Sequence, residues 1–332
     1  MGLKTLLYRI DKIGEKSNET IFVKKARHNI VRIAWVITRT ILLTGLSFVL
    51  LYPIIYMFSM AFRSVDEVLD PAIIWVPKTL TLVNITHSIE LMEYSRSVVQ
   101  TIRISVVSSL IQIFTACLAG YGFARFKFKG KSILFSLLIL TIVIPPQTTI
   151  IPLYLQNQFF DFLFIGNIGK LITGHPWTIN LIDTGWSLYL PALFANGIRS
   201  GLIIYIFRQF FSGMPKELED SAYIDGAGPI KTFFKIMAPN AGVAFLTVFL
   251  FSIVWYWNDF YYASMFLVNE STLAIKLSRL TMALIVEFGN NYFVAIPYLQ
   301  AGCLLVIAPV LFIYIIFQRF FTESIERTGI VG

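Results

Sequence analysis

Long apolar blocks are the feature that most limits what this chain can fold into. A helix needs about 20 consecutive apolar residues to cross the roughly 30 Å hydrocarbon core of a bilayer. Backbone groups find no water there, so a span must be a helix or part of a closed barrel. The chain lacks the period-two alternation of barrel strands. We therefore predict an all-α polytopic membrane protein with about six transmembrane helices, near residues 40–62, 98–122, 132–152, 187–207, 240–262 and 297–318.

The composition agrees with this fold class. Charged residues make up 14% of the chain, whereas soluble domains carry roughly 25%. Cys117 and Cys303 both fall within predicted spans, so we expect small buried apolar side chains there and no disulfide. The three histidines, His28, His87 and His175, lack ligand-like spacing, and we expect no metal. No Gly-rich phosphate-binding motif is present, so any ATP would be bound by another chain.

The chain divides into three predicted regions. Residues 1–39 form a basic leader without a small-residue cleavage site, so we expect the first span to remain as an anchor. Residues 40–320 form the transmembrane domain, and residues 321–332 form a tail.

The distribution of positive charge predicts the orientation. If the amino terminus is inside, 19 Lys and Arg residues lie in inside segments and six in outside segments. Inside loops of membrane proteins carry this excess. We therefore expect both termini in the cytoplasm and a location in the bacterial cytoplasmic (inner) membrane. The net charge of +8 then reflects a basic inner rim that meets anionic lipid, with no nucleic-acid partner.

The inside segment 212–239 is the most informative loop. Three acids follow Pro215 in a first helical turn, where the helix dipole favours them: Glu217, Glu219 and Asp220. Gly226 breaks this helix, and Pro229 opens another, with an apolar stripe of Ile230, Phe233, Phe234 and Met237. We predict two short helices with a sharp bend. They would lie on the membrane surface or dock into a groove of a cytoplasmic partner.

This segment resembles the EAA loop of permease subunits of ABC importers. Residues 220–222, Asp-Ser-Ala, stand in the place of Glu-Ala-Ala, and residues 225–227 and 236–239 also fit the pattern. The whole chain resembles the carbohydrate-uptake branch, of the maltose and oligosaccharide type. Four further segments carry this resemblance: residues 119–130, 144–154, 257–260 and 297–321. One departure is Asp220, which is one methylene shorter than the usual Glu.

The resemblance implies a type I ABC importer permease fold and a transporter subunit, which is not an enzyme. It implies a second permease chain in a shared pathway, two ATP-binding subunits that hold ATP and Mg, and an extracytoplasmic solute-binding protein that delivers a sugar or oligosaccharide. The EAA loop would couple the permease to the ATPases. Its expected coupling residues are Glu217, Glu219, Asp220, Ser221, Ala222, Asp225, Gly226, Ala227 and Pro239, with Gly226 needed because a side chain would prevent a close approach.

Two outside segments have candidate roles. By the resemblance, residues 263–296 would reach into the binding protein through Glu287, Gly289, Asn290, Asn291 and Tyr292. An ordinary outside loop is the alternative. Residues 156–186 are longer than the family norm, and we expect them to meet the binding protein or the sister permease.

Polar and aromatic side chains in or near the spans are candidates for the substrate pathway. They are Gln112, Asn196, Trp255, Trp257, Asn258 and Asp259. Hydrogen bonding between helices is the common alternative for such polar groups, and the sister chain could hold most of the sugar.

Two other functions remain open. An ABC permease for a polyol or glycerol phosphate would have the same fold, and Arg103 and Arg199 at span edges would serve a phosphate cargo. A secondary transporter usually has internal repeats and buried charges, and the sequence has no convincing repeat.

Overall fold

The computed structural model describes the backbone of residues 3–329 except Pro71, Ile74, Leu163, Phe164, Glu270 and Asn290, and it describes side chains from His28 to Gln318, without Asn167 and Tyr292. Within this part of the chain the secondary structure is helical, with two isolated bridges and no strand. The predicted all-α class is therefore confirmed.

The chain forms two compact units, residues 1–59 and 60–332. The first unit is nearly all of α1 (Leu3–Ala61), a single helix that contains the predicted first span. Its residues His28–Ala61 are apolar enough to cross a bilayer. The helix also continues back through the predicted leader without a break.

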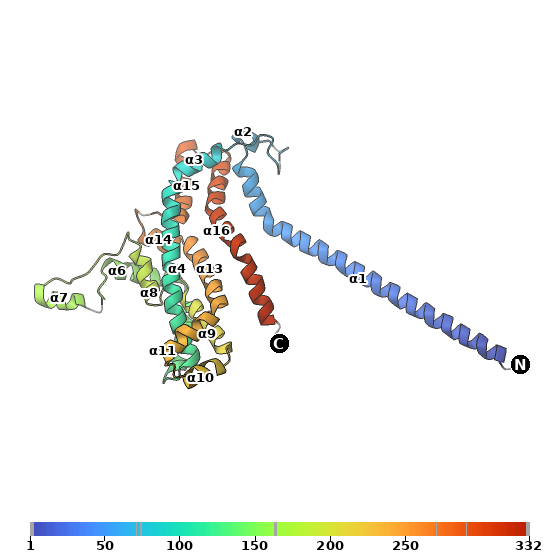
Figure 1. The fold of residues 1–332 in the computed structure, drawn as a ribbon. Coiled ribbons are helices and arrows are strands. Elements are labelled where there is room, and N and C mark those ends of the chain that lie inside the picture. Colours follow the sequence, from blue (N-terminus) through green and yellow to red (C-terminus); the bar gives the residue numbers. More distant parts are fainter. Residues whose placement is uncertain are drawn as a thin grey trace. The chain divides into compact units, whose positions relative to one another are not determined.

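The second unit is built around α4 (Tyr94–Arg125), the long helix drawn upright in Figure 1. It packs against α8 (Trp186–Leu193), α9 (Ser200–Gly213) and α13 (Gly242–Trp257). Gly120 permits a close approach of α4 to α9, because a Cβ there would lie 2.5 Å from the Cβ of Phe207 on α9. The main apolar core fills this junction.

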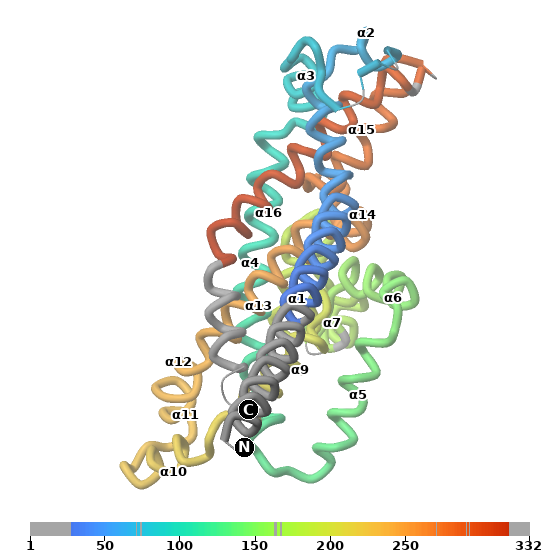
Figure 2. Tube along the Cα trace, turned by 90° about the vertical axis from the view of Figure 1, so that its right-hand side faces the viewer, coloured from blue at the N-terminus to red at the C-terminus, as the bar shows by residue number. Residues whose placement is uncertain are grey.

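A second group of helices packs at one end of α4. It consists of α2 (Val65–Val68), α3 (Val83–Leu91), α15 (Leu273–Phe288) and α16 (Tyr292–Gly329). Three side chains donate hydrogen bonds to backbone carbonyls of α16: Ser88 to Tyr298 at 2.8 Å, Tyr94 to Leu305 at 3.0 Å and Trp257 to Val306 at 3.0 Å. Figure 2 shows this end at the top and α10–α12 at the opposite end.

Several predicted spans are broken rather than continuous. Residues 132–152 form α5 (Lys131–Val143) and α6 (Pro146–Gln158), which meet at 102°. The reason is Pro145–Pro146, because proline lacks the N–H group and disfavours helix in the residue before it. Residues 187–207 divide between α8 and α9, with left-handed backbone at Ala195 and Arg199.

The predicted fifth span, 240–262, is interrupted near its end, because α13 stops at Trp257 and the next helix begins at Tyr261, and the chain also bends where α13 begins. A chain of short elements, α11 (Pro229–Thr232), the π-helical turn η2 (Phe233–Met237) and α12 (Ala238–Asn240), precedes α13 at an angle of 74°. Short helices α7 (Ile165–Thr173), α10 (Glu217–Ile224) and α14 (Tyr261–Phe266) complete the fold. Among the described residues three helices can span a membrane, or five if each bent pair is one span.

We expect Gly120→Ala to destabilise the protein, because its Cβ would collide with Phe207, and overpacking a core costs about 1–3 kcal/mol. Gly122→Ala is the matched control, since the nearest atom to its Cβ is 3.9 Å away. Thermal unfolding of the detergent-purified protein measures both. Equal melting temperatures for the two variants would contradict this account of the α4–α9 junction.

Candidate functional site

Residues 215–239 form a bent surface unit, which we call the elbow. Helix α10 ends at Ile224, Gly226 follows with a φ of +79°, and α11 begins at Pro229. The amide of Ala227 donates to the carbonyl of Ala222 at 2.9 Å, which closes the turn. The predicted pair of short helices is therefore present. Apart from the two chain neighbours, no atom of the described residues lies within 4 Å of a Cβ added to Gly226, so within this chain the left-handed backbone is what favours glycine.

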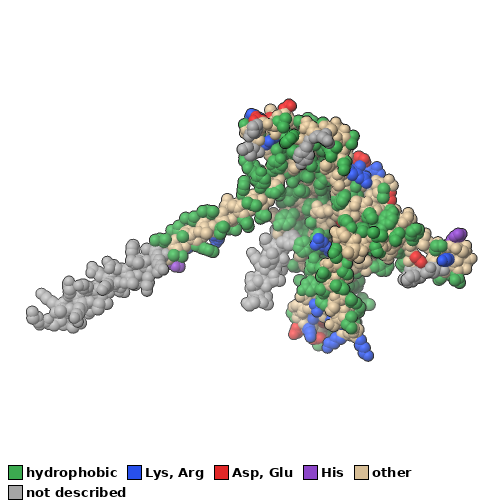
Figure 3. Space-filling model, turned by 180° about the vertical axis from the view of Figure 1, so that it is seen from behind, with side chains coloured by type: hydrophobic (Ala, Val, Ile, Leu, Met, Phe, Trp, Pro, Cys, Tyr) green, Lys and Arg blue, Asp and Glu red, His purple; other side chains and the backbone are tan. Residues whose placement is uncertain are grey.

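The elbow exposes both charge and apolar surface. Figure 3 shows acidic and basic side chains gathered at this end of the second unit. Among the predicted coupling residues, those exposed are Glu217, Asp220, Ser221, Asp225, Gly226 and Pro239. Ile224 and Ile230 are 86% and 76% exposed. This surface therefore combines carboxylates with uncovered aliphatic side chains.

Two predicted coupling residues point inward instead. Ala222 is buried in the elbow, and Glu219 is buried against α4. The hydroxyl of Tyr121 donates to Oε1 of Glu219 at 2.6 Å, and Nε of Arg125 lies 3.2 Å from Oε2. Nη2 of Arg125 also donates to the carbonyl of Met214 at 2.7 Å. We call Tyr121, Arg125 and Glu219 the Glu219 anchor; it fixes α10 to the end of α4.

Aromatic packing surrounds this anchor. The ring of Tyr121 lies 5.3 Å from the ring of Phe211 and 4.9 Å from that of Phe233. The predicted apolar stripe is only half correct, because Phe233 and Met237 are buried whereas Ile230 and Phe234 are exposed. The cause is the π-helical turn, since i→i+5 hydrogen bonding does not keep the spacing of an α-helical face.

At the other end of α4, the turn between α15 and α16 is supported by α3. Oε2 of Glu287 lies 2.8 Å from Nε2 of His87, and Phe288 stacks on Tyr298 with ring centroids 5.2 Å apart. Gly289 has a φ of +63°. Of the predicted binding-protein contacts, Glu287, Gly289 and Asn291 are exposed. Asn290 and the side chain of Tyr292 lie outside the described residues.

The start of α15, at the end away from this turn, is joined to the amino-terminal part of α4 and to Glu93 just before it. The amide of Leu273 donates to Oγ1 of Thr101 at 2.9 Å. Nζ of Lys276 donates to Oε1 of Glu93 at 2.6 Å, and this hydrogen bond holds the pKa of Glu93 below its usual value. Helix α4 thus contacts the elbow at one end and α15 at the other.

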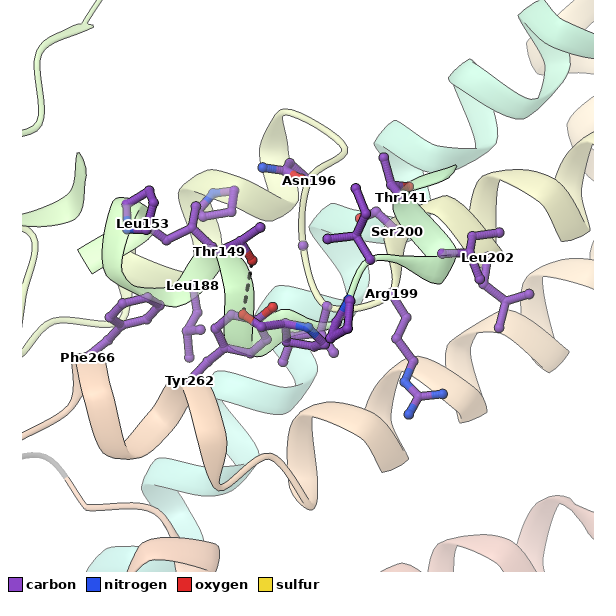
Figure 4. Close-up of a pocket in the computed structure, with 18 of the residues that line it drawn as sticks. Thr141, Thr149, Leu153, Leu188, Asn196, Arg199, Ser200, Leu202, Tyr262 and Phe266 are labelled. Atoms are coloured by element: carbon purple, nitrogen blue, oxygen red, sulfur yellow. Dashed lines mark hydrogen bonds between the residues drawn. The ribbon is translucent and has the colours of Figure 1, made fainter. Parts of the chain in front are cut away.

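A cavity of about 580 Å³ lies where the broken spans meet. The α5–α6 break, the connection between α8 and α9, and α14 form its walls. Its polar lining includes Thr141, Thr149, Asn196, Arg199 and Tyr262, and a hydrogen bond joins Thr149 to Tyr262 (Figure 4). The guanidinium of Arg199 lies 5.1 Å from the ring centroid of Trp255.

The structure separates the predicted pathway residues. Asn196 lines the cavity, and Trp255 is half-buried beside Arg199. Gln112 is fully buried and donates to the carbonyl of Ile198 at 2.7 Å. Trp257 is buried between α13 and α16. These last two residues hold helices together and do not line the cavity.

Asn258 and Asp259 also bond locally. Nδ2 of Asn258 donates to Val254 within its own helix at 2.9 Å. The carboxylate of Asp259 accepts the amide of Ala263 at 2.9 Å at the start of α14. Sequence reasoning missed the polar cavity residues Thr141, Thr149 and Tyr262, and it considered Arg199 only for a phosphate cargo. Pro145–Pro146 was the available signal, since a broken span exposes polar backbone that is tolerated only where it is buried in protein or lines a cavity.

These features define a class: a membrane permease whose broken spans enclose a cavity and whose anchored elbow lies at one end. Residues 112–327 match the family described as binding-protein-dependent transport system inner membrane component. The chain belongs to this family. It is therefore an inner-membrane transporter subunit and not an enzyme, as predicted.

Two similar proteins are also permease proteins. The chain is similar to the arabinooligosaccharides transport system permease protein AraQ of Halalkalibacterium halodurans, with 27% identity over 90% of this chain and 97% of the relative. It is also similar to the melibiose/raffinose/stachyose import permease protein MelC of Bacillus subtilis, with 28% identity over 78% of this chain and 84% of the relative.

A solved structure has the same fold. It is the crystal structure of a bacterial ABC transporter involved in the import of the acidic polysaccharide alginate. The TM-score is 0.65, with 22% identity over 86% of this chain and 95% of that chain. The predicted type I ABC importer permease fold is confirmed, and the secondary-transporter alternative is not favoured.

We expect Glu219→Gln to loosen the elbow, because it leaves the guanidinium of Arg125 buried without its counter-charge. Breaking such a pair costs about 3–5 kcal/mol. Hydrogen exchange of the α10 amides should become faster. Asp220→Asn, at the exposed neighbouring position, is the matched control and should leave exchange unchanged. Unaltered exchange in Glu219→Gln would refute the anchoring role.

Proposed function

We propose that this chain forms, with a second permease chain, the pathway of an ABC importer for a sugar or oligosaccharide. The relatives AraQ and MelC, named for oligosaccharide transport, support this cargo. An extracytoplasmic binding protein would deliver it, and two separate subunits would bind ATP and Mg. Both termini of this chain would lie in the cytoplasm, with the elbow.

The observation that carries the proposal is the elbow itself. Its exposed face offers Asp220, Ile224 and Ile230 to a partner, while its buried face is fixed to α4. An exposed helix with apolar side chains suits a groove on another protein. The whole set of exposed coupling residues would contact the ATPase, and Glu219 and Ala222 would hold the helix in place.

Movement of the ATPases would enter the membrane through this rigid junction. Because the carboxylate of Glu219 is bound by both Tyr121 and Arg125, α10 and the adjacent end of α4 would move together. Helix α4 also contacts α15 through Thr101 and Glu93. The turn at Glu287, Gly289, Asn290, Asn291 and Tyr292, which follows α15, would meet the binding protein.

The cavity is suited to a polyhydroxyl cargo. Hydroxyl groups of Thr141, Thr149 and Tyr262 and the amide of Asn196 can exchange hydrogen bonds with sugar hydroxyls. Pro145, Pro146 and Leu153 supply apolar walls. Sites of this kind, largely apolar with a few polar groups, orient small ligands.

We expect Gly226→Val to abolish uptake and binding-protein-stimulated ATP hydrolysis in proteoliposomes. Valine disfavours a φ of +79°, so the bend would change and the docking surface would be displaced. Gly228→Val is the matched control, because Gly228 is also exposed but has a φ of −74°. Normal uptake by Gly226→Val would contradict the coupling role of the elbow.

We expect Asn196→Leu to raise the KM for sugar uptake about 10-fold, the effect of losing one to two hydrogen bonds. Asn258→Leu should leave the KM unchanged, because its side chain donates to Val254 of its own helix and does not line the cavity. Initial uptake rates over a range of sugar concentrations measure both. An unchanged KM in Asn196→Leu would remove this cavity from the pathway.

A further inference from the structure

Residues 157–181 form a self-contained arm between α6 and α8, which we call the α7 arm. Its base is closed by backbone hydrogen bonds: the amide of Leu181 donates to Asn157 at 2.9 Å, and Phe160 and Ile179 exchange bonds of 3.0 and 2.9 Å. Figure 1 shows α7 to one side of the helices around α4, running across the direction of α4. This arm has no role in the coupling elbow.

One face of α7 is covered by the arm's own chain. Gly166 and Gly169 lie there, and the amide of Trp177 donates to the carbonyl of Gly166 at 3.4 Å. A Cβ on Gly169 would lie 2.5 Å from the indole ring of Trp177. The two glycines thus leave room for Trp177 to pack on this face of α7. The opposite face is therefore turned away from the rest of the arm.

The face turned away is apolar and uncovered. Ile165, Ile168, Leu171 and Ile172 follow helical spacing and are 45%, 58%, 92% and 69% exposed. Lys170 is exposed outside this stripe. Contiguous exposed apolar surface of this kind marks contact with a partner or a membrane.

Lipid is the occupant that the surrounding surface favours. Exposed apolar side chains continue along α5 at Ile133, Leu137 and Leu140, along α6 at Ile151, Leu155 and Phe159, and then to α7. Taken together, α5 and α6 are long and apolar enough to form a bent membrane span, and the uncovered side of such a span would meet acyl chains. The apolar face of α7 follows these exposed residues along the chain.

The length and composition of the arm exclude a span and fit an interface. Nine residues of helix are about 14 Å long, whereas the hydrocarbon core is roughly 30 Å thick. An apolar stripe with Lys170 outside it, beside the half-exposed Trp177, is typical of a helix that lies in the interfacial plane.

We propose that α7 lies flat in the outer leaflet, with Ile165, Ile168, Leu171 and Ile172 in the acyl region and Lys170 at the headgroups. The arm would then tether one wall of the cavity to the bilayer, because Asn157, at its base, also lines the cavity. This lipid contact is independent of the cargo and of the elbow.

Spin labelling tests the proposal in the assembled transporter. Leu171→Cys and Lys170→Cys, each in a chain with Cys117 and Cys303 replaced by alanine, would carry a nitroxide in proteoliposomes. We expect the label at position 171 to collide more with oxygen than with a water-soluble nickel chelate, and the label at position 170 to show the opposite preference. Retained sugar uptake confirms that each labelled complex is intact.

Three results would overturn the proposal. Preference for the nickel chelate at position 171 would place the stripe in water. Protection from both relaxers would mean that protein, such as the second permease or the binding protein, covers it. Preference for oxygen at both positions would bury α7 entirely in lipid. None of these results depends on which cargo is transported, so failure here leaves the proposed import function intact.

Discussion

The buried pairing of Glu219 with Tyr121 and Arg125 is the interaction on which the rest of the site depends. Both charged side chains are nearly enclosed, with exposures of 7% for Arg125 and 10% for Glu219. Removing two charges from water is costly, and only good geometry with further hydrogen bonds compensates it. Here the Tyr121 hydroxyl and the Met214 carbonyl supply those bonds. The elbow therefore has one defined position on α4.

The broken spans create a second problem. Where a helix is interrupted inside the membrane domain, backbone N–H and C=O groups lose their hydrogen-bond partners within the helix. The structure satisfies them with side chains: Gln112 donates to the carbonyl of Ile198, and the amide of Ile198 donates to the hydroxyl of Tyr256 at 3.2 Å. Irregular backbone at membrane depth is tolerated where it is buried in protein or lines a cavity. The helix breaks are therefore found where the backbone is buried or lines the cavity.

Helix α4 contacts α9, the elbow and α15, and so connects them. It packs on α9 through Gly120, binds the elbow through Glu219, and receives α15 at Thr101. A permease driven from outside the membrane needs such a continuous element, because a flexible loop would dissipate the motion. The α7 arm lies apart from this chain of contacts, and its role concerns the bilayer instead.

The sequence by itself determined the membrane class, the positions of the apolar blocks and the bend at Gly226, because hydropathy and turn preferences act over neighbouring residues. It could not distinguish Glu219 from Asp220, two acids in one helical turn, of which one is buried and the other exposed. It left open whether Gln112 lines the pathway or joins helices, and it did not identify Trp257 as a packing residue. Only the tertiary structure decided these, because their partners lie far along the chain: Tyr121 is 98 residues from Glu219, and Ile198 is 86 residues from Gln112.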